Sequence, residues 1–470
     1  FISRLLDGNL INIIRDRGFE VITLGDYPKT DNTSDTDWLG VSQKDDAKDT
    51  IEELKGRIVD TLFVDHYNLD SKWETLIKPY VGSIAVIDDL ANRKHNCDFL
   101  IDHNFRNDNS NCYEPLVSSS CKTLLGLQFA ILSPEYREYR KTTSNRNGKI
   151  NRVLIYFGGT DWQNMTNLAL KVLSQEEFCH LEVDVVIGGN YPFLSDLRQL
   201  INKRPKTNLH QSLPNLASLM SSSDLAIGGG GTTMWERMSM GLPAVVISLA
   251  NNQLPACRAL QKENLIHYLG TYEEVSDNML KKCLEERISN PEQNLDTSIR
   301  ISDYVDGLGD LRIAQEIFPP SIESINLRAC KSSDAKQIFN IGNHHSAFGS
   351  LEGYSFKDLN SVGEKLDIDL FDNCCKIFSI EFNNLILGVI KHEYSSEDGI
   401  VFISYIFNSN TKDMLPSLLK KSSDMALLLM PIINSTEIAS FDQNFSMFCL
   451  SKTCMQHYEN TLNQNKKVVL

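Results

Sequence analysis

Four consecutive glycines, residues 228–231, stand between an apolar run and a helix-forming stretch. The run 225–227 predicts a strand, and the residues up to about 240 predict a helix that Gly241 and Pro243 should end. Without Cβ atoms the strand-to-helix turn lets a ligand reach the backbone, and the unpaired N–H groups of a helix start favour an anion. The pattern suits a diphosphate, although a tight glycine turn without a ligand has the same sequence.

Polar side chains near this turn could bind the rest of a nucleotide. Glu236 could accept hydrogen bonds from ribose hydroxyls, but Thr233 and Glu236 also have the spacing of a capping box, in which the carboxylate returns to the backbone N–H of Thr233. Asn252 and Gln253 follow the predicted strand 244–247 and could bind sugar or phosphate oxygens, or simply form a turn. The candidate binding residues of this part of the chain are Gly229, Gly230, Gly231, Thr232, Glu236, Asn252 and Gln253.

A second set of polar side chains ends three apolar runs earlier in the chain. The runs 61–64, 84–87 and 99–101 predict buried strands, and each is followed by an aspartate. After the first of them, Tyr67 could hydrogen-bond a sugar, and Asp65 or His66 could move protons. Polar residues that only solvate the end of a strand would give the same pattern.

Two further groups favour structural roles. Asp88 and Asp89 are followed by Arg93 and His95, which predicts a salt-bridged loop. After the glycines 158–159, the segment from Asp161 to Thr166 predicts a capped helix start. That helix end is a second and weaker candidate for an anion site.

The order of these segments predicts the architecture. Short apolar strands that alternate with helices and end in polar residues indicate parallel sheets with sites at their carboxyl edges. This pattern extends over residues 1–140 and again over 151–318, and residues 141–150 between them are polar and predict a linker. The sequence therefore predicts two Rossmann-like α/β halves. Over 325–470 the apolar runs lie closer together, which predicts antiparallel strands and an α+β domain.

Composition narrows the class of protein. The 470 residues carry a net charge of −15, so a nucleic acid or an anionic membrane surface is not expected as the main partner. No apolar run reaches about 18 residues, so no membrane-spanning helix is expected. Eleven cysteines without CxxC pairs predict reduced thiols and a cytoplasmic location. No metal-ligand spacing and no GxSxG, HExxH, Walker or EF-hand motif occurs, so no metal is expected.

The motifs together resemble the nucleotide-sugar hydrolases of pseudaminic acid synthesis, the UDP-2,4-diacetamido-2,4,6-trideoxy-β-L-altropyranose hydrolases, and their spore-coat polysaccharide relatives. The resemblance covers about residues 1–318, and the second half also resembles the UDP-binding half of MurG-type glycosyltransferases. It implies the glycosyltransferase B fold with UDP on the second half. The segments that carry it are 64–67, 73–74, 87–93 with His95, 97–98, 100–102, 157–161, 228–236 and 252–253.

The resemblance also implies a reaction. In that family water attacks the anomeric carbon and UDP leaves, without an essential metal. Tyr67 and Asn252 would contact the sugar, and Glu236 the uridine. The general base of the family is a histidine in an N-terminal Gly-x-Gly-His loop, which this sequence does not contain, and residues 1–20 resemble the helix that follows that loop. The catalytic residue is therefore left unassigned. A glycosyltransferase of the same fold and a non-catalytic UDP-sugar binder remain alternatives.

The last part of the chain resembles another family. Residues 325–470 resemble the GNAT-type N-acetyltransferases, through Leu327-Arg328 and the predicted strands around 387–390 and 403–405. The resemblance implies acetyl-CoA as a cofactor. Active members bind its pyrophosphate with a glycine-containing loop, whereas the corresponding residues 409–416 contain no glycine. Acetyl transfer and a degenerate interaction module are both open.

Overall fold

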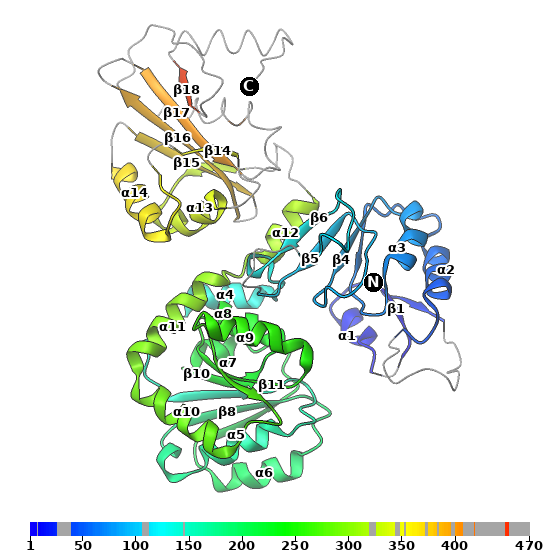
Figure 1. Cartoon of the computed structure of the whole chain (residues 1–470), viewed down its shortest axis with the longest axis vertical. Helices are drawn as coiled ribbons and strands as arrows, with labels where there is room; N and C mark the ends of the chain where they lie inside the picture. The colour runs from blue at the N-terminus through cyan, green and yellow to red at the C-terminus, as the bar shows by residue number, and fades with distance from the viewer. Residues whose placement is uncertain are drawn as a thin grey trace. The chain divides into compact units, whose positions relative to one another are not determined.

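The computed structural model divides the chain into two compact units, Phe1–Ile313 and Ala314–Leu470 (Figure 1). The residues that it describes are 1–6, 8–25, 39–105, 112–143, 146–318, 326–343, 348–351, 354–371, 375–382, 385–395, 400–407, 418 and 447–450.

The first sheet of the first unit is parallel, as predicted from the apolar runs. Its four strands are adjacent in chain order: β3 (Thr61–Val64), β4 (Ser83–Ile87), β5 (Phe99–Asp102) and β6 (Lys122–Leu125). Trp73 and Ile77 of a helix pack with strand residues in one buried cluster. The other elements of this region are β1 (Ile2–Arg4) paired with β2 (Ile22–Leu24), α1 (Ile11–Asp16), α2 (Gln43–Leu54), α3 (Ser71–Ile77) and α4 (Pro134–Thr142).

The second sheet has six parallel strands in the order β12-β11-β10-β7-β8-β9, which is the strand order of the Rossmann fold. The chain order reverses between the two central strands, β7 and β10. In such sheets this reversal is where ligands bind, beyond the carboxyl ends of the strands. The strands are β7 (Arg152–Tyr156), β8 (Glu182–Ile187), β9 (Thr207–Gln211), β10 (Leu225–Gly229), β11 (Ala244–Ser248) and β12 (His267–Thr271).

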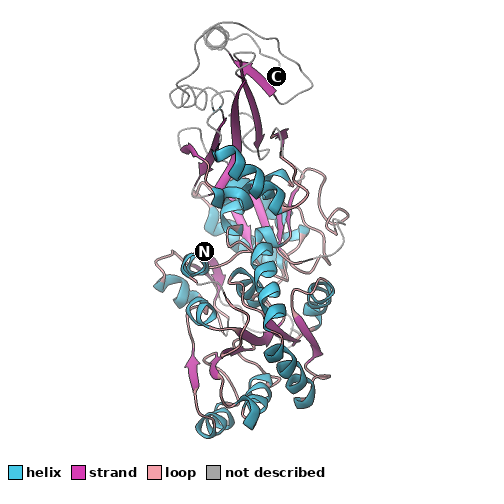
Figure 2. Ribbon diagram, turned by 90° about the vertical axis from the view of Figure 1, so that its left-hand side faces the viewer, coloured by secondary structure: helices cyan, strands magenta, loops and turns pink. Residues whose placement is uncertain are grey.

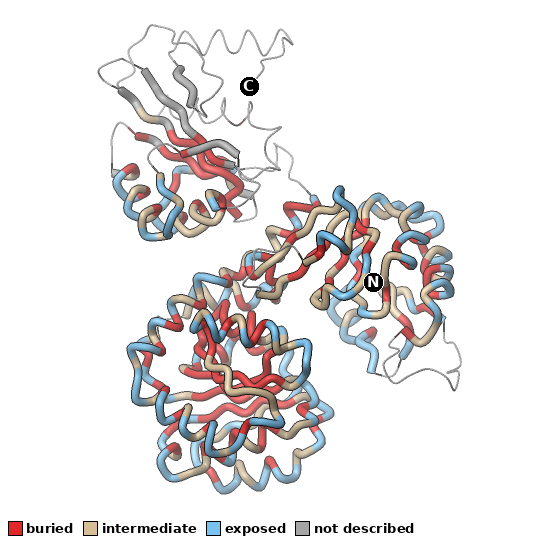
Figure 3. Tube along the Cα trace, viewed as in Figure 1, coloured by how far each residue is buried: buried red, intermediate tan, exposed pale blue. Residues whose placement is uncertain are grey.

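Helices cover both faces of the second sheet. Because successive strand residues point to opposite faces, each strand contributes to two buried clusters. Val153 and Ile155 belong to one buried cluster, and Leu154 between them belongs to the other. Figures 1 and 2 show the helices around these strands, and Figure 3 shows that the strands form the buried centre. The first cluster includes residues of α5 (Met165–Leu173), α6 (Leu194–Lys203) and α10 (Asp277–Ser289), and the second includes residues of α7 (Ala217–Ser222), α8 (Thr233–Ser239), α9 (Leu254–Lys262) and α11 (Pro291–Tyr304).

Arginine side chains hydrogen-bond the segment between the first and second sheets to backbone carbonyl groups around the second sheet. Arg146, within the predicted linker, donates from Nε to the carbonyl of Gly241 (2.9 Å) and from Nη2 to that of Met220 (2.7 Å). Arg140 of α4 donates to the carbonyl of Ser302 (2.8 Å). Further along, α12 (Gly309–Ile317) returns to the connection after β6, where Arg312 donates to the carbonyl of Gln128 (2.9 Å).

The second unit contains the antiparallel sheet that the sequence predicts. Its strand order is β13-β15-β16-β17-β14, and β18 also pairs with β17, along residues 401–404. The predicted acetyl-CoA loop 409–416 lies outside the described residues. The elements are β13 (Asn326–Ala329), α13 (Ala335–Gly342), β14 (Phe348–Ser350), α14 (Leu359–Phe371), β15 (Cys375–Phe382), β16 (Leu385–Ser395), β17 (Ile400–Phe407) and β18 (Met447–Leu450).

Candidate functional site

Two glycine-containing loops leave the central strands of the second sheet at the point where the chain order reverses. After β7, Gly158 has φ +95°, and a Cβ atom at Gly158 or Gly159 would meet no heavy atom within 4 Å. After β10, the backbone N–H groups of Gly230, Gly231 and Thr232 have no hydrogen-bond acceptor among the described residues. The strand β10 and the helix α8 confirm the predicted strand–glycine–helix unit. Its unpaired donors lie where an anion could accept hydrogen bonds from them.

The four glycines of the second loop do not all serve the same purpose. A Cβ atom at Gly228 would lie 2.3 Å from the carbonyl oxygen of Tyr156, and one at Gly230 would lie 2.5 Å from Sγ of Cys257. The sequence suggested that all four expose backbone to a ligand, but these two are required by internal packing. At Gly231 the nearest atom would be 3.7 Å away, on Gln253. Gly231 is therefore the glycine of this loop at which bare backbone faces the most open space.

Glu236 does not form the capping box. Helix α8 starts at Thr233, no side chain caps its first turn, and no hydrogen bond joins the Glu236 carboxylate to the N–H of Thr233 in the described structure. The carboxylate instead lies near the hydroxyl of Tyr136 on α4 and interacts with it electrostatically. Burial raises the pKa of Glu236, while the Tyr136 hydroxyl and the nearby Arg237 oppose the rise. Glu236 lies five residues after Gly231. Its partly desolvated carboxylate can accept hydrogen bonds from hydroxyl or N–H groups of a ligand.

Gln253 lies beside the glycine loop, and Asn252 is exposed next to it. Both belong to the short 3-10 helix η4 (Asn251–Gln253) that follows β11. The Gln253 side-chain oxygen accepts a hydrogen bond from the backbone N–H of Leu249 (2.9 Å), so it stabilises the turn. Its Nε2 is the atom nearest to Gly231. The turn and the ligand interpretations of Gln253 are therefore compatible, since its two ends face different partners.

The second candidate anion site is already occupied by a side chain. The carboxylate of Asp161 accepts hydrogen bonds from the backbone N–H groups of Met165 (3.0 Å) and Thr166 (2.8 Å) at the start of α5. Asp161 and Asn164 both have positive φ, at 44° and 57°, which bends the loop so that this capping is possible. The predicted capped helix start is confirmed, and the same contacts remove the donors that a bound anion would need.

The carboxyl edge of the first sheet gathers titratable groups from three adjacent strands. Tyr67, after β3, donates from its hydroxyl to Asp89 Oδ2 after β4 (3.0 Å). Burial raises the pKa of Asp65 and of Asp89, and burial together with Asp89 raises the pKa of Tyr67 to about 12. His103, after β5, is near enough to both carboxylates to be influenced by them. The structure thus brings Tyr67 and Asp65 into one polar group.

His103 is a residue to which the sequence assigned no role. Its ring packs edge-on against Trp235 of α8, with ring centroids 6.3 Å apart and an interplanar angle of 76°. Trp235 directly precedes Glu236, so this contact links the edge of the first sheet to the helix of the glycine loop. The signal that could have drawn attention to it is the repeated Asp-His pair, Asp65-His66 and Asp102-His103, after two of the strands.

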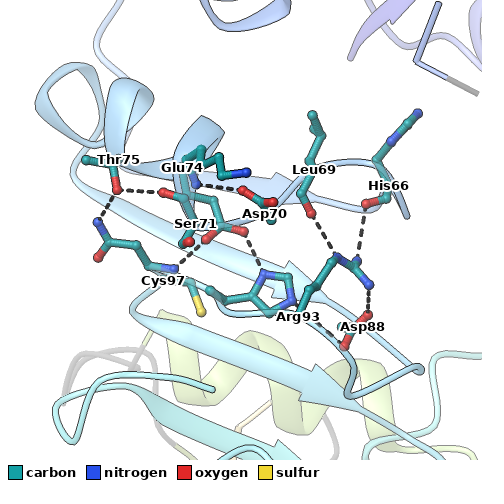
Figure 4. Close-up of polar contacts among 12 residues, drawn as sticks. His66, Leu69, Asp70, Ser71, Glu74, Thr75, Asp88, Arg93 and Cys97 are labelled. Carbon is teal, nitrogen blue, oxygen red and sulfur yellow. Dashed lines mark hydrogen bonds and ion pairs between the residues drawn. The ribbon is translucent and has the colours of Figure 1, made fainter. Parts of the chain in front are cut away.

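A buried ionic network supports the Asp65–Tyr67 segment and confirms the predicted salt-bridged loop (Figure 4). His95 Nδ1 lies 2.7 Å from Glu74 Oε1, and Arg93 Nη1 lies 2.8 Å from Asp88 Oδ1. Arg93 also donates from Nε to the carbonyl of Leu69 (2.9 Å) and from Nη2 to that of His66 (3.4 Å). The network therefore holds the backbone on both sides of Tyr67.

The charge of His95 should make folding stability depend on pH. Burial alone would lower its pKa, but the neighbouring carboxylates of Asp88 and Glu74, the latter hydrogen-bonded to Nδ1, raise the pKa from 6.5 to about 9. Because the folded value is the higher one, the stabilisation is complete below about pH 6.5 and is lost as the pH rises through 9. The free energy of unfolding, measured with urea, should fall by up to about 3 kcal/mol over this window. His95→Gln should remove most of that slope, and an unchanged slope would contradict this protonation.

The part of the chain that contains the glycine loop is similar to a known protein family. Residues 153–302 match the model of the glycosyltransferase family 28 C-terminal domain. Among the described residues no helix could cross a bilayer, and no group of three or more His, Cys, Asp or Glu side chains could hold a metal ion.

Curated relatives match longer stretches of the chain than this family model does. The spore coat polysaccharide biosynthesis protein SpsG of Bacillus subtilis is 23% identical over 266 residues, 56% of this chain and 77% of that protein. The UDP-2,4-diacetamido-2,4,6-trideoxy-β-L-altropyranose hydrolase of Campylobacter jejuni is 26% identical over 213 residues, 45% of this chain and 75% of that protein. An uncharacterized protein of Methanocaldococcus jannaschii is 28% identical over 200 residues, and the chain spans 41% of its length.

Solved glycosyltransferases are also similar in structure. MurG of Acinetobacter baumannii gives a TM-score of 0.48 at 12% identity, covering 67% of this chain and 89% of that one. WaaG, a glycosyltransferase of lipopolysaccharide biosynthesis, gives 0.36 at 13% identity, covering 68% and 100%. The part of this chain that holds the glycine loop is similar in sequence to the C-terminal domain of family 28 glycosyltransferases, and the relatives include proteins named for nucleotide-sugar and polysaccharide metabolism.

Proposed function

We propose that this chain binds a UDP-linked diacetamido-trideoxy sugar and releases UDP by hydrolysis at the anomeric carbon, in the synthesis of pseudaminic acid or a surface polysaccharide. The observation that carries the proposal is the reversal of strand order between β7 and β10, where both exit loops expose glycine backbone. A diphosphate is the ligand that accepts several backbone N–H donors at such a place. The names of the Campylobacter and Bacillus relatives supply the class of sugar and pathway.

In this proposal the diphosphate lies along Gly229, Gly230, Gly231 and Thr232, and the side chains beside the loop orient the nucleotide. Glu236 binds the uridine, and Asn252 and Gln253 bind sugar or phosphate oxygens. Tyr67 contacts the sugar from the edge of the first sheet. Water attacks the anomeric carbon, the bond from that carbon to the phosphate oxygen breaks, and UDP leaves with the electron pair. Backbone donors stabilise the charge that develops on UDP, so the leaving group needs no metal.

Transfer to an acceptor hydroxyl is the second candidate. The family whose model matches residues 153–302 is a glycosyltransferase family, which favours this alternative. The bond that breaks and the leaving group are the same, and only the nucleophile differs.

Incubation with the UDP-sugar, with and without candidate acceptor alcohols, separates the candidates. Release of UDP in water alone supports hydrolysis, and release that requires an acceptor supports transfer. Retained UDP binding without any release would instead identify a UDP-sugar binder. Absence of UDP binding by calorimetry would refute the proposal.

Replacing Glu236 by glutamine should weaken UDP binding about 10- to 100-fold, because a hydrogen bond to a charged group contributes about 1.5–3 kcal/mol. Isothermal titration calorimetry measures the change. Glu138→Gln removes a carboxylate that pairs with Lys141 on the exposed surface of α4, and it should leave the affinity unchanged. Equal affinities of Glu236→Gln and the wild type would rule out a contact between Glu236 and the nucleotide.

A further inference from the structure

Two thiols of the first unit lie against each other where the strands β5 and β6 begin. Cys97 stands two residues before β5, and Cys121 directly precedes β6. Their Sγ atoms are 3.6 Å apart. The backbone fixes this approach, because β5 and β6 are hydrogen-bonded neighbours and the carbonyl of Asp98 accepts the N–H of Lys122 (2.8 Å). The pairing of the two strands therefore starts one residue after each sulfur and holds the two thiols in contact.

The separation is short enough for a covalent bond to form. A disulfide has sulfur atoms about 2.05 Å apart and Cα atoms about 4.4–6.8 Å apart, a range that includes the ~4.8 Å spacing of neighbouring strands. Closing the 3.6 Å contact between Cys97 and Cys121 therefore takes rotation of two side chains and little movement of the sheet.

The two cysteines differ in how easily a reagent reaches them. Cys97 is 3% exposed and belongs to the core of the first sheet, whereas Cys121 is partly exposed. With the Cys97 thiol as donor, the hydrogen bond between them lowers the pKa of Cys121 and raises the pKa of Cys97, and burial raises the latter further. Cys121 is thus the more accessible sulfur and the better source of a thiolate, which is the reacting form of cysteine.

We propose that Cys97 and Cys121 are a redox-active pair that a small disulfide, such as oxidised glutathione, converts into an intramolecular disulfide. The Cys121 thiolate attacks one sulfur of the reagent, which gives a mixed disulfide and releases one thiol. Cys97 then gives up its proton and attacks Cys121 Sγ, and the second thiol leaves. The protein loses two electrons and two protons, and the reagent gains them as two thiols. An excess of reduced thiol reverses both steps.

The new bond would lie beside the buried ionic network of the first sheet. Figure 4 shows Cys97 next to this network, in which the N–H of Asn96 is donated to Glu74, the partner of His95. A bond between Cys97 and the start of β6 closes the segment 97–121 into a loop and restricts the unfolded chain. The oxidised protein should therefore unfold at a higher temperature than the reduced protein.

The cysteine pair is separate from the proposed ligand site. Cys97 and Cys121 precede their strands and so lie at the amino edge of the first sheet, whereas Tyr67 and the glycine loop follow their strands. The inference goes beyond the proposed function and does not rest on it, since the disulfide forms whether or not the protein binds UDP.

The test treats the folded full chain with oxidised glutathione and maps linked peptides by mass spectrometry. The wild type should give a peptide that joins Cys97 to Cys121 and is about 2 Da lighter than its two reduced parts. Its thermal midpoint should rise by about 3 °C or more, and dithiothreitol should return the midpoint to the reduced value. A joined peptide that forms only in urea, or a midpoint that does not rise, would overturn the inference.

Single substitutions separate the two steps of the exchange. Cys97→Ser should stop at the mixed disulfide, with one glutathione on Cys121, because the second thiol is missing. Cys179→Ser is the matched control, since the partly buried Cys179 hydrogen-bonds the carbonyl of Gln175 (3.4 Å) instead of a thiol, and this variant should form the disulfide like the wild type. If wild-type Cys121 also keeps its glutathione, or neither thiol reacts, the two cysteines are only a packing contact.

Discussion

Replacing Glu74 by alanine should lower the free energy of unfolding by about 3–5 kcal/mol, because it leaves a buried cation without its partner. The Glu74 side chain is completely buried and accepts hydrogen bonds from His95 Nδ1 and from the backbone N–H of Asn96. The same imidazole faces Asp88, whose pKa falls to about 2 despite burial, through His95 and Arg93. Losing Glu74 therefore also weakens the network that holds the Asp65–Tyr67 segment.

Urea unfolding of Glu74→Ala at pH 6.5, where His95 is charged, measures this effect. Glu52→Ala is the control, since Glu52 is paired with Lys55 on the exposed surface of α2 and should change stability by less than about 0.5 kcal/mol. If Glu74→Ala lost less than about 1 kcal/mol, the ring would not be charged in the folded protein. The pH dependence predicted for His95 would then fail as well, so the two measurements check each other.

The sequence predicted those features that are encoded by neighbouring residues. Apolar runs of four or five residues, such as 61–64 and 153–157, are enough to indicate buried parallel strands, and polar residues after them mark the carboxyl edge. Gly241, with φ +58°, ends α8 as its position after the helix suggested. The salt-bridged loop around His95 was also predictable, since three of its members lie within eight residues.

Contacts between distant segments were not predictable in this way. The spacing of Thr233 and Glu236 fits a local capping box. In the structure the Glu236 carboxylate instead interacts with the hydroxyl of Tyr136, which lies 100 residues earlier in the chain. A single sequence does not show which side chains from two sheets will meet. His103 was missed for the same reason, since its partner Trp235 lies far along the chain. Local patterns located the glycine loop, and tertiary packing decided what surrounds it.

Alanine substitutions in the glycine loop, residues 228–231, should give the second large change in the free energy of unfolding. Gly228→Ala and Gly230→Ala should each destabilise the fold by about 1–3 kcal/mol, because the new methyl groups would overlap the Tyr156 carbonyl oxygen and Cys257 Sγ. Neither glycine has positive φ, so the cost comes from overlap rather than from backbone strain. Gly231→Ala should unfold like the wild type, since its methyl group would meet only Gln253, at 3.7 Å. Urea unfolding of the three variants measures the difference.

A double-mutant cycle with Cys257→Ala separates overlap from other causes. Removing Sγ makes room for the methyl group of Gly230→Ala, so the double variant should be more stable than the sum of the two single effects predicts, by about 1 kcal/mol or more. No such coupling is expected between Cys257→Ala and Gly228→Ala, whose obstacles are the carbonyl oxygen of Tyr156 and Nη1 of Arg237. Additive effects at Gly230 would contradict the packing role. If Gly231→Ala is as stable as the wild type but binds UDP more weakly, the methyl group obstructs the ligand rather than the fold. Gly231 would then serve ligand access, whereas Gly228 and Gly230 serve internal packing.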